Sequence, residues 1–351
     1  MLNDLFSNLR FLWNQWAHNH RYHGGLKAMA KCALGTINVN SNQQIAVSSI
    51  RQSSIESLTF SVFPQLTAIW SEYFVSATKN YDLKIRIGDC SGGDKPFIDY
   101  QKIIINPFLN IQHGKKIDIF LNKLISSQYV ILCDDDVFWL NSEPLDYALR
   151  SFKRDPEIAV VSLMPRDRVS SVLQGKINNP MGSYCLVIRN DIWKKENLSF
   201  KIKDPQSNNN YDWFYDTGDY ANIELIKRGY KVCIAEEEIR QNLVSFEGIS
   251  SWLMKIQKHR GEITNSIQGI PIRMQKAFRA ILVAEKINNT LYKKFESTEF
   301  FVMSQDYLNI AKKITINEMS SKIISKIEGE TDQMLSKLLS HLPSSLSRKV
   351  S

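Results

Sequence analysis

Three adjacent carboxylates, Asp134, Asp135 and Asp136, are the residues of this chain best placed to do chemistry. Apolar residues 129–133 lead directly into them, and residues 137–140 are apolar again. Such a run is typical of a strand buried in a parallel sheet, whose carboxyl end is where open α/β sheets bind ligands. Adjacent carboxylates repel one another, and a hard divalent cation relieves that repulsion and can clamp phosphate oxygens. The sequence therefore predicts a metal and phosphate site here, with an acidic turn after a core strand as the plainer alternative.

A second candidate, Asp89, ends an earlier apolar segment and precedes Ser91, Gly92 and Gly93. Glycines let a ligand approach the backbone closely. A carboxylate at the end of a strand can accept hydrogen bonds from ribose hydroxyls or from a base N–H, as in dinucleotide-binding folds. Asp89 is therefore a candidate for nucleoside binding, although a glycine-rich turn without function fits the same residues.

Residues 213–219 combine aromatic and acidic side chains just before a predicted helix. Trp213 and Tyr215 are candidates for a sugar platform beside a carboxylate that removes a proton from an acceptor hydroxyl. Asp219 and Asp216 are the two carboxylates available for that role. In the structural alternative Asp216 caps the helix, Asp219 is a first-turn acid and the aromatic residues belong to the core.

A fourth group of candidates lies in residues 245–252, where Ser245 and Glu247 precede Gly248. The hydroxyl and the carboxylate are candidates for completing the shell around a metal or a diphosphate, and Gly248 would allow close approach. By itself this cluster does not indicate a function, and it supports a metal or diphosphate site only in combination with the three adjacent carboxylates.

The elements that must position these residues alternate between strand and helix. Strands are predicted at residues 45–50, 83–87, 102–105, 129–133, 158–162 and 181–188, and helices at residues 55–79, 115–124, 144–153 and 219–228. This alternation predicts an α/β fold with a mostly parallel sheet and flanking helices. Polar stretches at residues 166–179 and 204–210 interrupt it, as expected of loops at the ligand end of such a sheet.

The chain divides into three predicted regions, residues 1–43, 44–270 and 271–351. The first is an amphipathic helical extension that carries Leu, Phe and Trp at helical spacing together with Arg and His. A basic helix of this kind can lie on a membrane, and packing on its own domain or on a neighbouring subunit is an equal alternative. The second region holds the α/β domain. The third is a helical appendage whose apolar stripes suit self-association, a partner or a membrane.

Composition restricts the partners and the compartment. The 351 residues carry a net charge of +8, which favours an anionic partner. Zinc-finger spacing, RNA-binding motifs and concentrated Lys/Arg blocks are absent from the sequence, so nucleic acid is not expected. The five scattered cysteines are typical of a reduced, cytosolic protein. We expect neither a signal peptide nor a transmembrane helix, because no apolar run approaches the roughly 20 residues that span a bilayer.

In their order along the chain these segments resemble the GT-A-type, family-2-like glycosyltransferases, which use nucleotide-sugar donors. The resemblance covers residues 44–255. It rests on Ile85-Arg-Ile-Gly-Asp89-Cys-Ser-Gly-Gly93, His113-Gly-Lys-Lys-Ile-Asp118, Val130-Ile-Leu-Cys-Asp-Asp-Asp136, and Gly218-Asp219 followed by Leu225-Ile-Lys-Arg-Gly-Tyr-Lys231. In that family the strand-end Asp contacts the nucleoside, the Asp-x-Asp element holds a metal, and an acid at the start of a later helix acts on the acceptor.

The resemblance implies a GT-A (Rossmann-like) fold with helical N- and C-terminal extensions. It also implies metal-dependent transfer of a sugar from a nucleoside-diphosphate donor to an acceptor hydroxyl. Asp134 and Asp136 would hold Mn2+ or Mg2+, with Asp136 the more direct ligand, and Asp135 would lie beside the donor. Asp89 would bind the nucleoside, and Lys115 would face a phosphate.

Two positions depart from the family's pattern. Gly218 stands where the family usually has Glu, which makes Asp219 the first candidate for the catalytic base and Asp216 the second. Ser245 stands where many members carry a His that helps hold the metal or the diphosphate. The implied acceptor is a glycan or a lipid-linked sugar, reached in the cytoplasm or at the inner face of a membrane, and the C-terminal helices suit a homo-oligomer. The donor's sugar and base and the stereochemistry stay open.

Two other classes of protein fit part of the pattern. Residues 134–136 also match the D-x-D that opens the D-x-D-x-[T/V] motif of HAD-type phosphatases, in which the first Asp is a nucleophile. In that superfamily the motif belongs to the first strand of the domain, whereas several predicted elements precede Asp134 and Asp136 here. A catalytically inactive binding module with the GT-A fold is the third alternative, because the usual Glu and His are missing.

Overall fold

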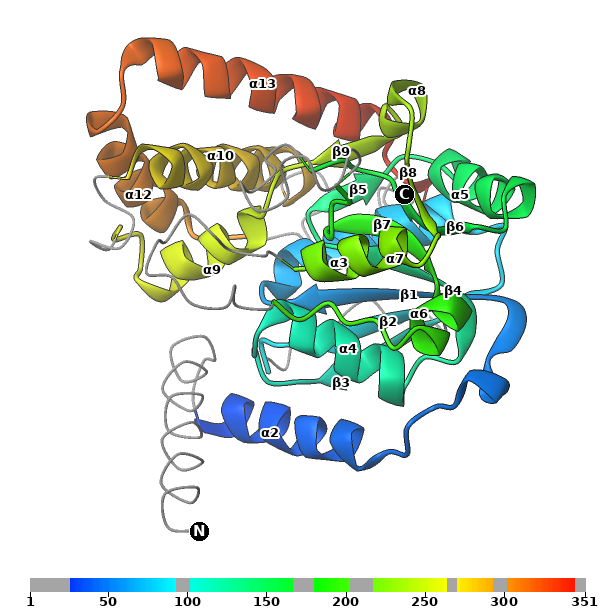
Figure 1. The fold of residues 1–351 in the computed structure, drawn as a ribbon. Helices are drawn as coiled ribbons and strands as arrows, with labels where there is room; N and C mark the ends of the chain where they lie inside the picture. Colours follow the sequence, from blue (N-terminus) through cyan, green and yellow to red (C-terminus); the bar gives the residue numbers. More distant parts are fainter. Residues whose placement is uncertain are drawn as a thin grey trace, which may run out of the picture.

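A seven-stranded mixed sheet forms the centre of the molecule (Figure 1). The computed structural model describes residues 26–92, 102–166, 180–202, 217–263, 270–292 and 302–344. The strand order is β3-β2-β1-β4-β7-β6-β8, and β7 runs antiparallel to both of its neighbours. The strands are β1 (Arg51–Ser61), β2 (Leu83–Asp89), β3 (Ile103–Pro107), β4 (Ser127–Cys133), β6 (Ile158–Ser162), β7 (Cys185–Arg189) and β8 (Lys231–Ile234). The predicted α/β class, with a mostly parallel sheet and flanking helices, is confirmed.

A second, two-stranded sheet lies next to the carboxyl end of β4. It pairs β5 (Val137–Trp139) with β9 (Leu243–Ser245) in antiparallel register. Only the three residues 134–136 separate β4 from β5. The three carboxylates therefore lie at the junction between the two sheets.

Helices cover both faces of the large sheet (Figure 1). The described helices are α2 (Leu26–Ser41), α3 (Pro64–Ala77), α4 (His113–Lys123), α5 (Glu143–Arg154), α6 (Asn190–Lys195), α7 (Asp219–Lys227), α8 (Glu237–Arg240), α9 (Ile249–Lys258), α10 (Pro271–Ile287), α12 (Gln305–Asn317) and α13 (Ser321–Ser340). Two short helical turns, Val47–Ser49 and Asn288–Tyr292, complete them. The core on one face is contributed by α3, α5 and the helices from α9 onward, and the core on the other by α4, α6 and α7.

The first strand and the first covering helix differ from the sequence-based expectation. The strand expected at residues 45–50 is β1, Arg51–Ser61, and the helix expected to start at residue 55 starts at Pro64. Proline lacks an N–H group and is preorganised for the first helical turn, so it begins α3 instead of interrupting a longer helix. The prediction of helix for residues 55–61 was therefore wrong.

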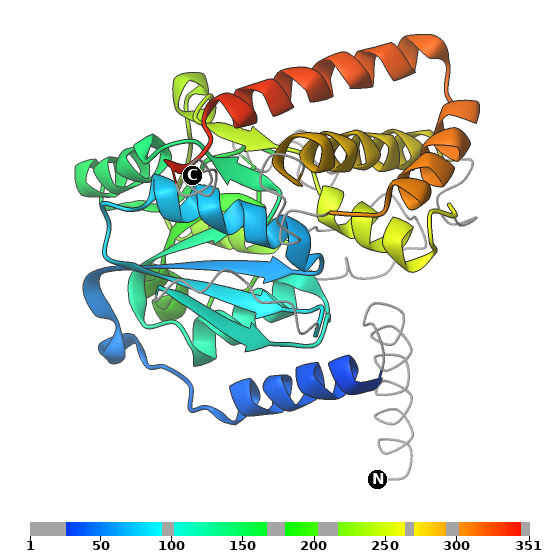
Figure 2. The ribbon, with the colours of Figure 1, turned by 180° about the vertical axis from the view of Figure 1, so that it is seen from behind.

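The C-terminal helices share one core with the sheet (Figure 2). Leu335 and Leu338 of α13 are buried in the cluster that includes Trp70 of α3, and Tyr73 donates a 2.9 Å hydrogen bond to the carbonyl of Leu338. The apolar stripe of α13 is thus covered largely by its own chain. The boundaries at residues 43 and 270, and self-association through these helices, stay predictions. Among the described helices none has the length and apolarity needed to cross a membrane.

Candidate functional site

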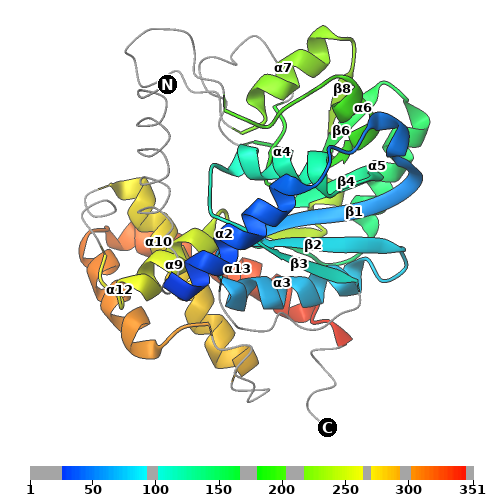
Figure 3. The same ribbon diagram turned by 90° about the horizontal axis from the view of Figure 1, so that it is seen from below.

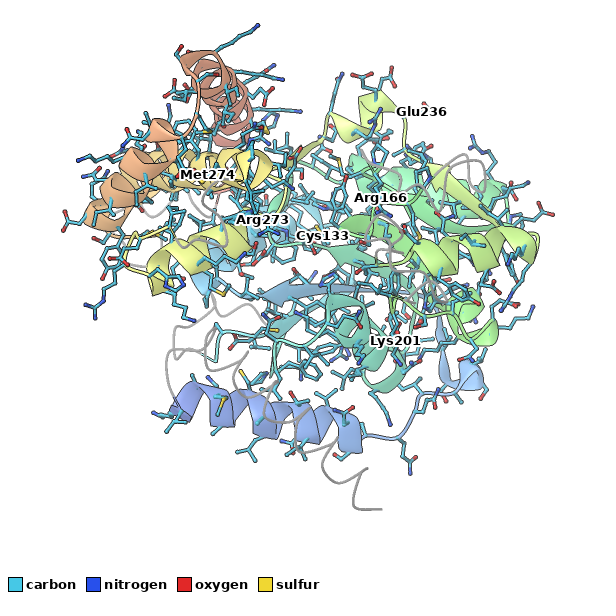
Figure 4. The ribbon with its side chains drawn as sticks, turned by 60° about the vertical axis from the view of Figure 1, so that its left-hand side comes forward. Cys133, Arg166, Lys201, Glu236, Arg273 and Met274 are labelled. Atoms are coloured by element: carbon cyan, nitrogen blue, oxygen red, sulfur yellow. The ribbon has the colours of Figure 1, made fainter. Side chains whose placement is uncertain are left out.

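The three carboxylates form a tight turn between the two sheets, called here the Asp turn (residues 134–136). The turn follows Cys133, the last residue of β4, which is labelled in Figure 4. The N–H of Val137 donates a 3.1 Å hydrogen bond to the carbonyl of Asp134, and the N–H of Phe246 donates a 3.0 Å bond to the carbonyl of Asp136. Backbone bonds from β5 and from the residue after β9 therefore hold the turn at the carboxyl end of a central strand, as predicted.

Asp135 is anchored by two hydroxyl groups. Its Oδ2 accepts a 2.6 Å hydrogen bond from Thr67, and its Oδ1 accepts a 2.8 Å bond from Ser250. Thr67 in turn lies 2.6 Å from the hydroxyl of Ser61. Burial, followed by the neighbouring charge of Asp136, raises the pKa of Asp135 to about 7. Because both of its oxygens are engaged within the protein, Asp135 links β1, α3 and α9 rather than facing a ligand.

Asp136 is held by the N-terminus of α9. Backbone N–H groups of Gly248, Ile249 and Ser250 hydrogen-bond the carboxylate and favour its charged form, while burial, the larger effect, raises its pKa to about 6. Gly248, at the helix N-cap, has a φ of +82°, which a residue with a side chain rarely adopts. Asp136 Oδ2 is buried and has no hydrogen-bond partner. That oxygen is available to a ligand.

Asp134 is the most accessible of the three, with 38% of its side chain exposed. Surrounding protein atoms, followed by the carboxylates of Asp136 and Asp135, raise its pKa well above the usual value. The Nε2 atom of His113, the first residue of α4, lies 3.9 Å from Asp134 Oδ1. Burial and the nearby charge of Lys116 lower the pKa of His113, so this contact joins a neutral ring to the carboxyl group.

A small pocket that opens to solvent lies beside Asp134, lined also by Thr59, His113 and Ser183. Lys116 lies close to this pocket and is buried, with its ammonium donating a 3.0 Å hydrogen bond to Asn110 and lying 4.7 Å from the centre of the Phe60 ring. The sequence-based choice at this position was its neighbour Lys115, which is half-buried. The helical spacing of Lys116 with Ile117 and Phe120 would have indicated that it faces inward.

Asp134 and Asp136 fit a divalent cation in part. Hard cations at phosphate sites are often held by one or two carboxylates, with the substrate phosphates supplying further oxygens. Asp136 Oδ2 has no hydrogen-bond partner, and the pKa values of Asp134 and Asp136 are both raised. A bound cation would pair with the free oxygen and stabilise the charged form of both carboxylates. Within the described ranges no three His, Cys, Asp or Glu side chains converge as a complete ligand set.

Asp89 lies at the same edge of the sheet, two strands away from β4. It pairs in register with Ser61 of β1 and is buried. Its Oδ1 accepts hydrogen bonds from the N–H and the hydroxyl of Ser91, at 2.9 and 2.6 Å. One carboxylate oxygen therefore shapes the glycine-containing turn, and nucleoside binding by Asp89 stays a prediction.

Asp219 is the first residue of α7 and is buried in an ion pair with Arg166. Arg166 is labelled in Figure 4. Gly218, at the N-cap with a φ of +86°, allows the chain to turn into this helix. The residues predicted to act beside Asp219 lie outside the described part of the chain; these are Trp213, Tyr215 and Asp216.

Ser245 and Glu247 separate in the structure. Ser245 lies opposite Val137 in the small sheet, and Val137 is the residue directly after the Asp turn. The Ser245 hydroxyl is buried without a hydrogen-bond partner. Glu247 lies 3.2 Å from Arg279 of α10, which also pairs with Glu330 of α13 at 2.6 Å. The structure thus brings Ser245 to the Asp turn, whereas Glu247 joins the C-terminal helices.

No family model and no curated protein matches the chain. Similar solved structures include galactosyltransferase LgtC in complex with donor and acceptor sugar analogues, with 13% identity, 52% of this chain and 73% of that chain covered and a TM-score of 0.34. Mannosyltransferase PcManGT from Pyrobaculum calidifontis in complex with GDP-Man and Mn2+ is 10% identical to this chain, and the match covers 90% of this chain and 94% of that chain with a TM-score of 0.36. 2-C-methyl-D-erythritol 4-phosphate cytidylyltransferase from Thermus thermophilus is 9% identical, and the match covers 59% of this chain and 99% of that chain with a TM-score of 0.34. At these identities and TM-scores, the similar structures assign no activity to this chain.

Proposed function

We propose that this protein is a metal-dependent glycosyltransferase that moves a sugar from a nucleoside-diphosphate donor to an acceptor hydroxyl. The observation that carries the proposal is that the three carboxylates of the Asp turn have different surroundings. Asp135 has both oxygens engaged in the protein, Asp136 keeps a buried oxygen without a partner, and Asp134 borders an open pocket. Two carboxylates are thus left to a cation at the ligand end of the sheet.

In this proposal Asp134 and Asp136 hold Mn2+ or Mg2+ against the donor diphosphate. The bound cation would offset the negative charge that develops on the leaving nucleoside diphosphate. The N-terminus of α9 keeps Asp136 oriented, and the anchored Asp135 keeps the turn in place. Lys116 supplies a fixed positive charge near the pocket without needing to move during the reaction.

Asp219 is our first candidate for the base that accepts the acceptor's proton, and Asp216 is the second. The Arg166 guanidinium contacts Asp219, so base action would require a change in that pairing when the acceptor binds. A retaining reaction would need no such base. Asp89 and Lys115 remain our candidates for the nucleoside and for a phosphate.

All five cysteines are free thiols, which supports a reducing compartment such as the cytoplasm. A lipid-linked or other glycan acceptor at the inner face of a membrane would suit that location and the net charge of +8.

The test is the release of nucleoside diphosphate from a panel of nucleotide sugars with Mn2+ and an acceptor mixture. We expect one donor to be consumed, Asp136→Asn to abolish the release, and the control Asp306→Asn, at an exposed position in α12, to leave it unchanged. Because a cytidylyltransferase is among the similar structures, the same samples should be assayed for pyrophosphate, which a nucleotidyl transfer would release. Pyrophosphate release without nucleoside diphosphate would contradict the proposal.

The alternatives predict other outcomes. A HAD-type phosphatase would hydrolyse a phosphomonoester, and this class is disfavoured because β1, β2 and β3 all precede the Asp turn. An inactive binding module would gain thermal stability from a nucleoside diphosphate and Mn2+ without consuming any nucleotide sugar.

A further inference from the structure

Helix α2 carries an exposed apolar stripe on its outer face. Of the eight large hydrophobic residues that are exposed in the described part of the chain, the three most exposed are in this helix: Leu26 at 64%, Leu34 at 62% and Ile37 at 62%. With the exposed Ala30 they fall within an arc of about 80° on a helix of 3.6 residues per turn. Leu26, Ala30, Leu34 and Ile37 are called here the α2 stripe.

The opposite face of α2 is fixed to the body of the protein, so the stripe is not simply one side of a loosely placed helix. Cys32 and Val39 are buried, and the hydroxyl of Thr36 accepts a 2.8 Å hydrogen bond from the N–H of Leu109. A Cβ atom added at Gly35 would lie only 2.0 Å from the carbonyl oxygen of Pro107. This close approach between helix and strand explains why the outer face is presented in one orientation.

Figures 1 and 2 show α2 as the outermost described element on its side of the molecule, and Figure 3 shows it in front when the molecule is seen from that side. Monomeric soluble proteins rarely leave a row of large apolar side chains uncovered, and such rows mark surfaces that bind another molecule or a membrane.

The charges around the stripe favour a lipid surface. Lys27 and Lys31 are exposed next to the stripe, and α2 contains no acidic residue. Residues 1–41 carry four basic residues, Arg10, Arg21, Lys27 and Lys31, against the single acid Asp4. Pairing of two copies of α2 across a two-fold axis would bring lysines together while adding no acidic residue from the helix. An anionic bilayer instead offers apolar depth for the stripe and negative charge for the lysines.

We propose that the α2 stripe docks on an anionic lipid bilayer, with its apolar side chains in the boundary between headgroups and acyl chains. The inner face of the same helix contacts the carboxyl end of β2, where the Cys32 thiol donates to the carbonyl of Asp89 at 3.5 Å. Docking would therefore hold the Asp89 edge of the candidate site near the membrane. The inference goes beyond the proposed transfer reaction and does not depend on it.

The test is co-sedimentation of the full chain with vesicles of phosphatidylcholine containing phosphatidylserine, compared with vesicles of phosphatidylcholine alone, without donor or metal. We expect binding to the anionic vesicles that weakens with added salt. Leu34→Glu/Ile37→Glu should weaken it by about tenfold or more, because two apolar contacts become charged. The matched control is Ile272→Glu, an exposed isoleucine at 41% on α10, which should bind like the wild type.

Lys27→Gln/Lys31→Gln provides an independent reading that leaves the apolar residues intact. It should lose roughly fivefold in affinity for each lysine removed. Circular dichroism and the melting temperature establish that each variant is folded.

Absence of wild-type binding, or equal binding by Leu34→Glu/Ile37→Glu, would overturn the proposal. So would a wild-type dimer that only this variant dissociates, because the stripe would then pair with a second copy. Since no donor or metal is present, none of these results bears on the transferase proposal.

Discussion

Thr67, in the first turn of α3, donates a 2.6 Å hydrogen bond to Oδ2 of Asp135, the middle residue of the Asp turn. With Ser250 on the other oxygen, this bond turns one of three adjacent carboxylates into a structural link between helices. The negative charge of Asp135 repels the carboxylates of Asp134 and Asp136, and a cation bound by these two neighbours would relieve that repulsion. The Asp135 side chain itself does not face the ligand.

Thr67→Val tests this link. It keeps the shape of the side chain but removes the donor, so a buried carboxylate oxygen loses a partner, and we expect the free energy of unfolding to fall by about 1–3 kcal/mol in urea. Thr59→Val is the matched control, because the Thr59 hydroxyl is buried without a partner. Its removal should change stability by no more than about 0.5 kcal/mol. Equal losses in the two variants would contradict the assignment.

The Asp turn should make the metal-free protein less stable as the pH rises. Burial and Asp136 raise the pKa of Asp135 to about 7, and burial raises that of Asp136 to about 6. The folded state thus binds these protons more tightly than the unfolded state, whose Asp pKa is about 3.9. The stability from protonation is complete below about pH 4 and is lost between about pH 4 and pH 7. Urea unfolding across this range should show the fall.

Two changes should reduce that fall in stability. Mn2+ should offset it by compensating the carboxylate charges, and Asp135→Asn should flatten the profile in the metal-free protein, because one titrating group is gone. A profile for Asp135→Asn with the same slope as the wild type would show that other groups cause the change.

Ser245→Ala should separate ligand binding from folding. The Ser245 hydroxyl is buried, unpaired and next to the Asp turn, so its loss should leave the stability of the ligand-free protein unchanged. If the hydroxyl contacts the diphosphate, nucleoside-diphosphate affinity with Mn2+ should fall by about threefold to tenfold in calorimetric titration. The control is Ser251→Ala, whose hydroxyl bonds the carbonyl of Gly248 at 3.0 Å within α9. Unchanged affinity in Ser245→Ala would remove Ser245 from the site.

Arg279 connects the segment after β9 to the C-terminal helices. It is 15% exposed and pairs with both Glu247 and Glu330, and the Glu247 backbone has a φ of +59°. Arg279→Gln should lower the free energy of unfolding by about 1 kcal/mol or more and weaken the stabilisation by Mn2+. Lys286→Gln on the same helix breaks an exposed pair with Asp332 and should be nearly neutral. Loss of stability with an unchanged response to Mn2+ would restrict Arg279 to a structural role.

Asp219→Asn addresses the acceptor side. We expect it to keep the stabilisation by Mn2+ and nucleoside diphosphate and to lose about 100-fold or more in sugar transfer, because an amide cannot accept the acceptor's proton. The control Glu224→Gln, half-buried on the same helix, should retain transfer, since it weakens only surface ion pairs. Undiminished transfer by a folded Asp219→Asn protein would exclude Asp219 as the base.

Local signals were enough to predict the α/β class and the position of the Asp turn. The apolar run of β4 and the carboxylates that follow it are neighbours in sequence, so strand, turn and chemistry can be read together. The start of α3 at Pro64 was equally local, and the error there came from setting the proline signal aside.

The roles within the site depended on contacts between distant residues. Asp135 is anchored by Thr67 and Ser250, which lie 68 and 115 positions away along the chain. Three adjacent Asp residues have the same side chain, and tertiary packing alone decides which of them is anchored and which keeps an unpaired oxygen.

What the sequence determined by itself is the kind of sheet and the carboxylates at the end of its central strand, because these follow from short-range periodicity and order. The tertiary structure decided that Lys116 rather than Lys115 is buried near the pocket, that Glu247 pairs with Arg279, and that α13 is packed into the core. The physical reason is that burial and pairing are set by the elements packed around a residue, and these come from all parts of the chain.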